Sequence, residues 1–247
     1  MAYFDQEHFD VRCEWGMAGV QQIAPSDVIV VVDVLSFSTS VEVALGRGAT
    51  VFPYRWKDDS AVMYAQERSA ELASPRNRFD GKYSLAPSSL INVPAGLRLV
   101  LPSPNGSNIA FTAMTTGAAV AAGCIRNASV VAAWAQKSGR RVTVVPAGER
   151  WADGSLRPAI EDLVGAGAII KQLQRRHSPE ATVAVAAFES FSGSLREQLL
   201  RCSSGRELAE RGFAADIELA AELDVSEIVP VLSGETFIAS TAAGVVA

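Results

Sequence analysis

Histidine and cysteine are scarce in this sequence, and their scarcity excludes several kinds of site. The 247 residues include only two histidines, His8 and His177, and three widely spaced cysteines, Cys13, Cys124 and Cys202. Their spacing matches no zinc or redox motif, so we expect neither a His/Cys zinc site nor a histidine-centred triad. The odd cysteine count fits reduced thiols and predicts a cytoplasmic protein. Any chemistry must therefore use carboxylates, hydroxyls, amides and arginines.

The sequence also lacks a signal peptide, a long apolar run and a basic surface. The N-terminus, MAYFDQEHFD, has no apolar segment of the kind that a signal peptide needs. No apolar run approaches the roughly 20 residues required to span a membrane. The formal net charge is −5, which argues against a surface for nucleic acid. We expect no nucleic-acid partner and no membrane partner, and a homodimer stays open.

Alternating strands and helices predict a three-layer α/β/α fold with a mainly parallel sheet. Hydrophobic residues make up 49% and charged residues 20%, an ordinary globular balance that allows one large domain or two small ones. The pattern predicts strands at 28–34, 50–53, 97–101, 118–122, 141–146, 227–232 and 237–240. It predicts helices at 38–46, 58–72, 107–115, 128–137, 158–176, 179–190, 194–202, 204–211 and 213–222. We expect an N-terminal α/β half (1–150) that carries the site loops and a helix-rich C-terminal half (151–247) that completes the cleft.

Polar residues follow three of the predicted strands. The first strand, VIVVV, is apolar throughout, as in a strand buried on both faces, and leads to Asp33, Ser36, Ser38 and Thr39. These residues are compatible with metal and phosphate chemistry, or with helix capping alone.

The other two loops have the same position after a strand. They carry Asn105, Gly106 and Ser107 in one case, and Glu149 and Arg150 in the other. Ligands bind at the carboxyl edge of open α/β sheets, so we expect the three loops to meet there. Asp33 and Asn105 should then lie within about 15 Å of each other, as one small-molecule site requires.

The helix predicted from Pro158 begins with a pair of acids. Asp162 falls on the apolar stripe formed with Ala159, Leu163 and Ala166, whereas Glu161 lies about 100° around the axis. We therefore expect Asp162 to point into the cleft and Glu161 to be the more exposed of the two. A carboxylate on an apolar stripe suits a cation ligand, although Asp162 is also compatible with a role at the positive end of the helix dipole.

These segments together resemble the 2-phosphosulfolactate phosphatase family. The family motif Asp-Val-Leu-Arg-Ala-Thr/Ser-Thr is similar to DVLSFST at 33–39, and Ser-Pro-Asn-Gly-Thr is similar to SPNGS at 103–107. An Ala-Gly-…-Gly-Glu segment and a later acidic pair resemble AGE at 147–149 and ED at 161–162. The family ending Gly-Phe, Asp, Asp-…-Val-Pro resembles residues 212–213, 216, 224 and 229–230. The resemblance covers roughly residues 25 to 235.

The resemblance implies a phosphoric monoester hydrolase that uses Mg²⁺ to cleave 2-phosphosulfolactate, a step toward coenzyme M. It implies Asp33, Glu149 and Asp162 as catalytic and metal-binding residues. The residues that it implies for binding the small anionic phosphoester are Ser36, Ser38, Thr39, Asn105, Gly106, Ser107 and Arg150. Attack by water directly and attack through a phospho-aspartate on Asp33 are both compatible with the sequence.

Two departures from the family pattern affect the expected substrate. Ser36 stands where the family has arginine, and the family's Gly-Glu-Arg segment has no counterpart in residues 71–89. An arginine that grips an anion with two hydrogen bonds is not replaced by serine, so we expect a different substrate preference unless Arg76, Arg78 or Arg150 compensates. An inactive member that only binds an anion, or another enzyme class on the same scaffold, is the alternative.

Overall fold

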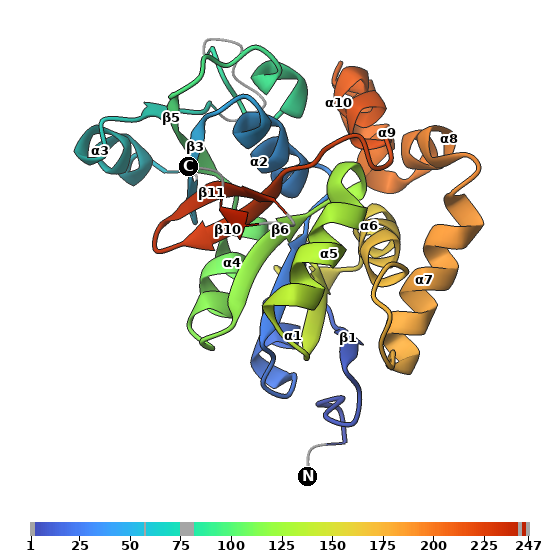
Figure 1. Cartoon of the computed structure of the whole chain (residues 1–247). Helices are drawn as coiled ribbons and strands as arrows, with labels where there is room; N and C mark the ends of the chain where they lie inside the picture. The colour runs from blue at the N-terminus through green and yellow to red at the C-terminus, as the bar shows by residue number, and fades with distance from the viewer. Residues whose placement is uncertain (1–2, 57, 75–81, 242–243, 246–247) are drawn as a thin grey trace.

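A ten-stranded sheet runs through the middle of the protein, between two layers of helices (Figure 1). The computed structural model describes residues 3–56, 58–74, 82–241 and 244–245. The strands of the sheet are β1 (Val11–Cys13), β2 (Val28–Val32), β3 (Thr50–Tyr54), β4 (Glu71–Leu72), β5 (Arg98–Pro102), β6 (Ala119–Gly123), β7 (Val142–Pro146), β10 (Val229–Ser233), β11 (Thr236–Thr241) and β12 (Gly244–Val245). The three-layer α/β class predicted from the sequence is confirmed.

The helices follow the predicted order except for α1, which was not predicted, and the end of the helix predicted at 58–72, where Glu71–Leu72 form strand β4. They are α1 (Gly16–Gln22), α2 (Phe37–Gly46), α3 (Ser60–Glu67), α4 (Gly106–Met114), α5 (Ala128–Ser138), α6 (Ile160–Ile170), α7 (Pro179–Phe191), α8 (Leu195–Arg201), α9 (Ser203–Glu210) and α10 (Ala214–Ala220), with 3₁₀ turns η1 (Pro87–Leu90) and η2 (Ile125–Asn127). Within the described residues, none of these helices has the length and apolar character needed to cross a bilayer.

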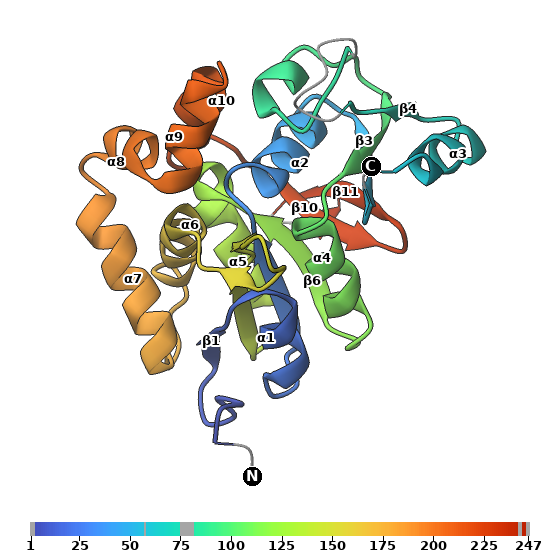
Figure 2. The same ribbon diagram turned by 180° about the vertical axis from the view of Figure 1, so that it is seen from behind.

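The valine-rich strand β2 is buried on both faces. Its residues alternate between two apolar cores: Val28, Val30 and Val32 pack with α5, α6 and α7, whereas Ile29 and Val31 pack with α2 and α4. Figure 2 shows the two helical layers from behind. Because successive side chains of a strand point to opposite faces, an unbroken apolar run suits a central strand with helices on both sides.

The sheet consists of two parallel blocks joined by a hairpin. One block is β1-β7-β2-β6 and the other is β3-β5-β4, and the hairpin β10–β11 pairs antiparallel with β6 on one side and β3 on the other. The direction therefore reverses three times between β6 and β3, so the blocks run in opposite senses. Because β5 runs opposite to β2 and β7, its carboxyl end does not lie at the same sheet edge as theirs. The expectation that all three loops follow one common edge of the sheet was therefore wrong.

Helix α4 nevertheless brings the loop after β5 close to the end of β2, through helix packing instead of strand pairing. α4 packs on β2 and β6 as well as on α1 and α2. Its N-terminus consequently lies against the end of β2, where Gly106 approaches Asp33. The position of this loop is thus decided by helix packing on the first block.

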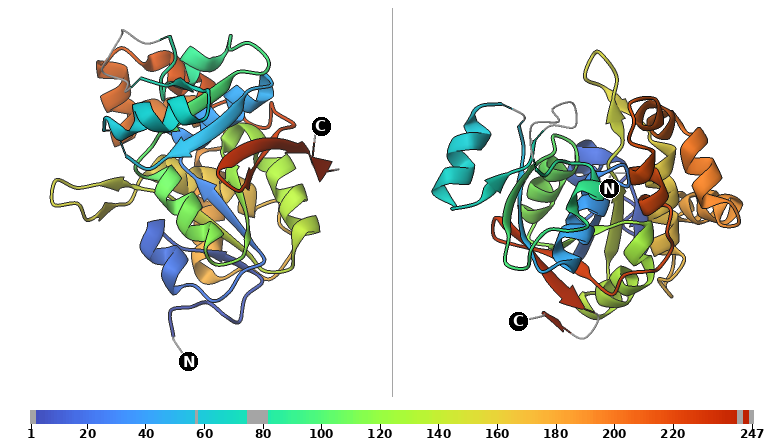
Figure 3. Two further views of the ribbon diagram at one scale, coloured as in Figure 1. Left: turned by 90° about the vertical axis from the view of Figure 1, so that its left-hand side faces the viewer. Right: turned by 90° about the horizontal axis from the view of Figure 1, so that it is seen from above.

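A projecting hairpin occupies the segment where the sequence suggested a division. Strands β8 (Glu149–Arg150) and β9 (Leu156–Arg157) pair antiparallel, and Figure 3 shows the hairpin extending from the body of the protein. The helix predicted at 158–176 is shorter in the structure, because α6 spans only Ile160–Ile170. The division into halves 1–150 and 151–247 stays a prediction, and α6 packs on β7 and β2.

Candidate active site

Asp33 stands at the end of β2, where the chain turns into α2. Its Oδ1 accepts a hydrogen bond from the Phe37 N–H (3.0 Å), and its own N–H donates to Ser38 Oγ (2.9 Å). The first turn of α2 is therefore built around the carboxylate. The side chain is buried, so its charge is only partly hydrated.

Gly106 allows the start of α4 to approach Asp33. A Cβ at this position would lie 2.2 Å from Cδ1 of Phe37 and 3.0 Å from Oδ2 of Asp33. Only glycine leaves room for this contact. The structure thus brings Asp33 together with the loop that carries Asn105, as the sequence predicted.

Glu149 joins this group from β8. Asn105 Nδ2 donates to its Oε2 over 3.0 Å. Burial, together with the nearby charges of Asp33 and Glu161, raises the pKa of Glu149 to about 7, while Arg157 and the Asn105 hydrogen bond act in the opposite direction. Glu149 therefore exchanges a proton near neutral pH.

Asp162, in the first turn of α6, links two strand ends. Its Oδ1 accepts from the Val34 N–H (2.7 Å) and its Oδ2 from the Gly148 N–H (2.9 Å). Burial and the carboxylates of Asp33 and Glu161 raise its pKa, and these two N–H donors partly oppose the shift. Asp162 points inward as predicted, but both of its oxygens already accept hydrogen bonds; its role as a metal ligand stays a prediction.

Glu161 corrects the sequence analysis. We expected it to be the more exposed member of the pair, yet Glu161 is 2% exposed and Asp162 is 4% exposed. The expectation was wrong because α6 is covered on several sides. Helix α7 packs along it, and Glu161 lies close enough to Cys202, which precedes α9, for its charge to raise the pKa of that thiol. An amphipathic stripe analysis assumes one buried face, which does not hold for a helix in the interior.

The predicted hydroxyls fall into two groups. Ser38 Oγ donates to the Val31 carbonyl (3.1 Å) and Thr39 Oγ1 to the Val34 carbonyl (2.7 Å), so both secure the turn after β2. In contrast, the Oγ atoms of Ser36 and Ser107 are buried and have no hydrogen-bond partner among the described residues. Such groups are costly, and they lie at the first turns of α2 and α4, where a bound anion would satisfy them.

Two arginines of the projecting hairpin lie beside the acids. Arg150 Nη1 donates to the Gly154 carbonyl (3.0 Å), and Arg157 Nη2 donates to Ser204 Oγ (3.1 Å). Arg157 is the cross-strand partner of Glu149 and lowers its pKa, a contribution that the sequence analysis missed. Arg76 and Arg78 lie outside the described residues.

The carboxylates suit a hard cation by their chemistry, though they do not form a ready cage. In the part of the chain that the structure describes, no three His, Cys, Asp or Glu side chains are arranged as a metal centre. Mg²⁺, however, is usually held by one or two carboxylates together with water and phosphate oxygens. Burial first, and then the charges of Asp33 and Glu161, raise the pKa values of Glu149 and Asp162, and a bound cation would offset the repulsion between these carboxylates.

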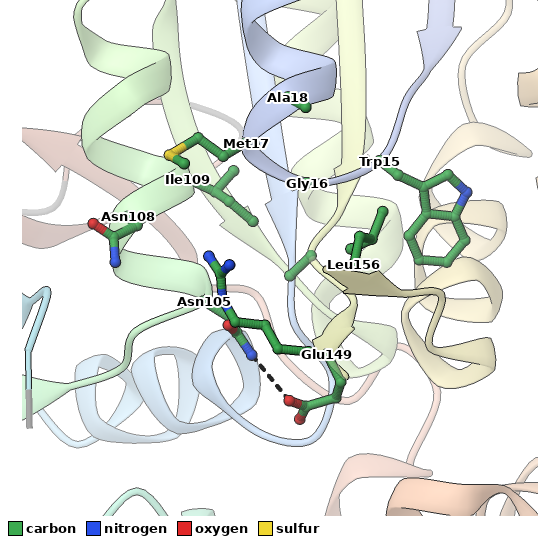
Figure 4. A pocket seen from close by; sticks show the side chains of 11 residues that line it. Trp15, Gly16, Met17, Ala18, Asn105, Asn108, Ile109, Glu149 and Leu156 are labelled. Atoms are coloured by element: carbon green, nitrogen blue, oxygen red, sulfur yellow. Dashed lines mark hydrogen bonds between the residues drawn. The ribbon is translucent and has the colours of Figure 1, made fainter. Parts of the chain in front are cut away.

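A pocket of about 180 Å³ opens beside the Asn105–Glu149 pair. Figure 4 shows Met17 and Ile109 on one side of it and Trp15 and Leu156 on the other. Helix α1 and β1 were not assigned from the sequence, so this pocket was not foreseen. Its position puts a predominantly apolar cavity next to the acidic group.

Comparison with known proteins connects this arrangement to a family. The family model described as 2-phosphosulpholactate phosphatase matches residues 17–235. The chain belongs to this family. The resemblance inferred from the motifs is thus confirmed, and the chain is a member of a family of phosphoric monoester hydrolases.

Proteins from three bacteria are similar to this chain over most of its length. A protein of Carboxydothermus hydrogenoformans named "probable 2-phosphosulfolactate phosphatase" is 29% identical over 216 residues, which are 84% of this chain and 87% of that protein. Proteins with the same name from Gloeobacter violaceus and Thermotoga maritima are each 28% identical, over 83% and 85% of this chain and 87% and 90% of their own lengths.

Proposed function

We propose that this protein is a magnesium-dependent phosphatase that hydrolyses a small acidic phosphomonoester of the 2-phosphosulfolactate type. The observation that carries the proposal is that carboxylates from the end of β2, from β8 and from α6 lie close to the starts of α2 and α4, where two buried hydroxyls have no hydrogen-bond partner within the described part of the chain. Membership of the family and the names of its relatives favour this substrate type.

Asp33 and Glu149 are the residues that would hold Mg²⁺. When bound, the cation neutralises charge on the phosphoryl group and polarises an attacking oxygen. Because the pKa of Glu149 is about 7 without a cation, loading at neutral pH would displace a proton from part of the molecules. Asp162 would act as a positioning residue, since it fixes the backbone after β2 and β7 through two hydrogen bonds.

The phosphoryl oxygens would lie between the first turns of α2 and α4. The hydroxyls of Ser36 and Ser107 supply donors there, and the positive ends of the two helices favour an anion. Asn105 orients Glu149 through its amide. Ser38 and Thr39 contribute by holding the loop shape.

Phosphate release from 2-phosphosulfolactate tests the proposal, measured with Mg²⁺ and with EDTA. Asp33→Asn keeps the size of the side chain but removes its charge, so we expect turnover to fall by roughly a hundredfold or more, as a loss of several kcal/mol implies. Asp59→Asn, an exposed carboxylate at the start of α3, is the matched control and should keep wild-type turnover. Absence of hydrolysis of any small phosphoester with Mg²⁺ would replace the proposal by the non-catalytic, anion-binding alternative.

A further inference from the structure

The pocket beside Glu149 has mainly apolar walls, and the acidic group lies at one end of it. Its side walls are formed by Trp15 and Met17 of the N-terminal segment, Ile109 of α4 and Leu156 of β9 (Figure 4). The polar groups of Asn105 and Glu149 lie at one end. A ligand whose phosphate lies at the first turns of α2 and α4 would thus extend into apolar surroundings.

Two glycines show that the apolar wall is built into the fold. Leu156 Cδ1 would lie 2.6 Å from a Cβ at Gly148 and 3.5 Å from one at Gly16. Both glycines have positive φ angles, +68° and +61°, which other residues rarely adopt. Gly148 therefore leaves the space that Leu156 occupies, and a Cβ at Gly16 would be at an ordinary contact distance from Leu156.

Two of the apolar side chains that line the pocket are partly open to solvent, whereas Ile109 is buried. Met17 is 39% exposed and Leu156 is 41% exposed, although each lies in an ordered element next to the candidate site. Leaving such groups in water forfeits burial energy, and a ligand that covers them recovers it.

Two charged side chains, Glu149 and Arg150, line the pocket. Among the described lining residues, Arg150 is the one cation, and its Nη1 donates to the Gly154 carbonyl. Glu149 faces the same space with the charges of Asp33 and Glu161 behind it. Apart from Asn105 and Asn108, the other lining residues are apolar or glycine.

We propose that this pocket binds the organic part of the phosphomonoester and selects an apolar group about the size of one six-membered ring. A cavity of roughly 150 Å³ lined by apolar side chains is large enough for benzene, and this pocket has about 180 Å³. The inference rests on the proposed phosphatase function for the position of the phosphate. It adds a substrate class, aryl or cycloalkyl phosphates, to the 2-phosphosulfolactate type.

Phenylphosphonate and methylphosphonate provide a direct test, because both carry the same dianion and neither is hydrolysed. Calorimetric titration of the protein in Mg²⁺ should show roughly tenfold tighter binding of phenylphosphonate, as burial of one ring predicts. Met17→Gln and Leu156→Gln should each reduce this ratio, whereas Met63→Gln, a 64% exposed methionine on α3, should leave it unchanged. The ratio of the two affinities is compared because a change in phosphonate binding common to both ligands cancels in it. Melting temperatures verify that each variant is folded.

Equal affinity for the two phosphonates, or no binding of either, would overturn the inference. So would a phenyl preference that survives both pocket variants. Hydrolysis of 2-phosphosulfolactate is measured separately: turnover without a ring preference removes only the inference, while a ring preference without turnover of any phosphoester removes the phosphatase function.

Discussion

Gly106→Ala is the substitution whose effect follows most directly from the structure. The added methyl group would lie 2.2 Å from Cδ1 and 2.7 Å from Cγ of Phe37, and 3.0 Å from Oδ2 of Asp33. Phe37 cannot turn away easily, because it is fully buried and its ring packs edge-to-face on Phe237 with centroids 5.9 Å apart. The start of α4 must therefore move away from α2.

The expected loss of stability can be worked from two opposing contributions. Overpacking a well-filled core costs about 1–3 kcal/mol, and a contact this short belongs at the upper end. Alanine in place of helical glycine returns up to about 1 kcal/mol. The net loss of about 2 kcal/mol corresponds to a fall of roughly 4–8 °C in melting temperature for a chain of this size.

Thermal unfolding followed by circular dichroism measures this change, with Gly193→Ala as the control. A Cβ at Gly193 meets nothing within 4 Å, so this variant should melt within roughly 2 °C of the wild type or slightly above it. Phosphate release should also fall in Gly106→Ala, because Asp33 and Asn105 are pushed apart. If Gly106→Ala melts like the wild type, the close approach of α4 to Asp33 described above is refuted.

Three further predictions concern the acids and the unpartnered hydroxyls. The folded protein keeps a proton on Glu149 that the unfolded chain releases between pH 4.5 and about 7, so stability in EDTA should fall as pH rises through this window. Glu149→Gln should flatten that fall and melt higher than the wild type at pH 8 but not at pH 4; parallel melting curves would contradict the assigned pKa. Asp162→Asn turns an amide N–H toward one of two backbone donors, so we expect a loss of about 1–3 kcal/mol in unfolding free energy, and an unchanged urea midpoint would show that the bridge is dispensable. Ser107→Ala should leave the melting temperature equal or higher, because no described residue hydrogen-bonds its hydroxyl, yet weaken phosphate binding roughly tenfold; unchanged affinity in calorimetry would remove Ser107 from the anion site.

The sequence identified the central elements because their patterns are local. The run VIVVV predicted a strand buried on both faces, and the structure places β2 between two helical layers with its side chains alternating between two cores. Helix α4 was expected at 107–115 and spans Gly106–Met114, since an apolar period and a preceding polar loop mark it. Elements without such a pattern, such as the three-residue strand β1 and the uncapped helix α1, were missed.

The burial of the acidic pair illustrates what periodicity misses. The stripe on α6 indicated that Asp162 points inward, which the structure confirms. It predicted an exposed Glu161, which was wrong because α7 packs along α6 and the segment at Cys202 lies near Glu161. Burial of a residue depends on what covers it, and that cover comes from residues distant in the chain.

The sequence by itself determined the fold class, the family and the three polar loops, because strand and helix periods and motif residues are written in consecutive positions. Only the tertiary structure decided how those loops meet. Two strand blocks run in opposite senses, and the packing of α4 on β2 and β6 is what places Gly106 against Asp33. The pKa of Glu149 and the pocket beside it likewise exist only in the folded chain, because burial and the nearness of other charges depend on distance in space and not on separation in sequence.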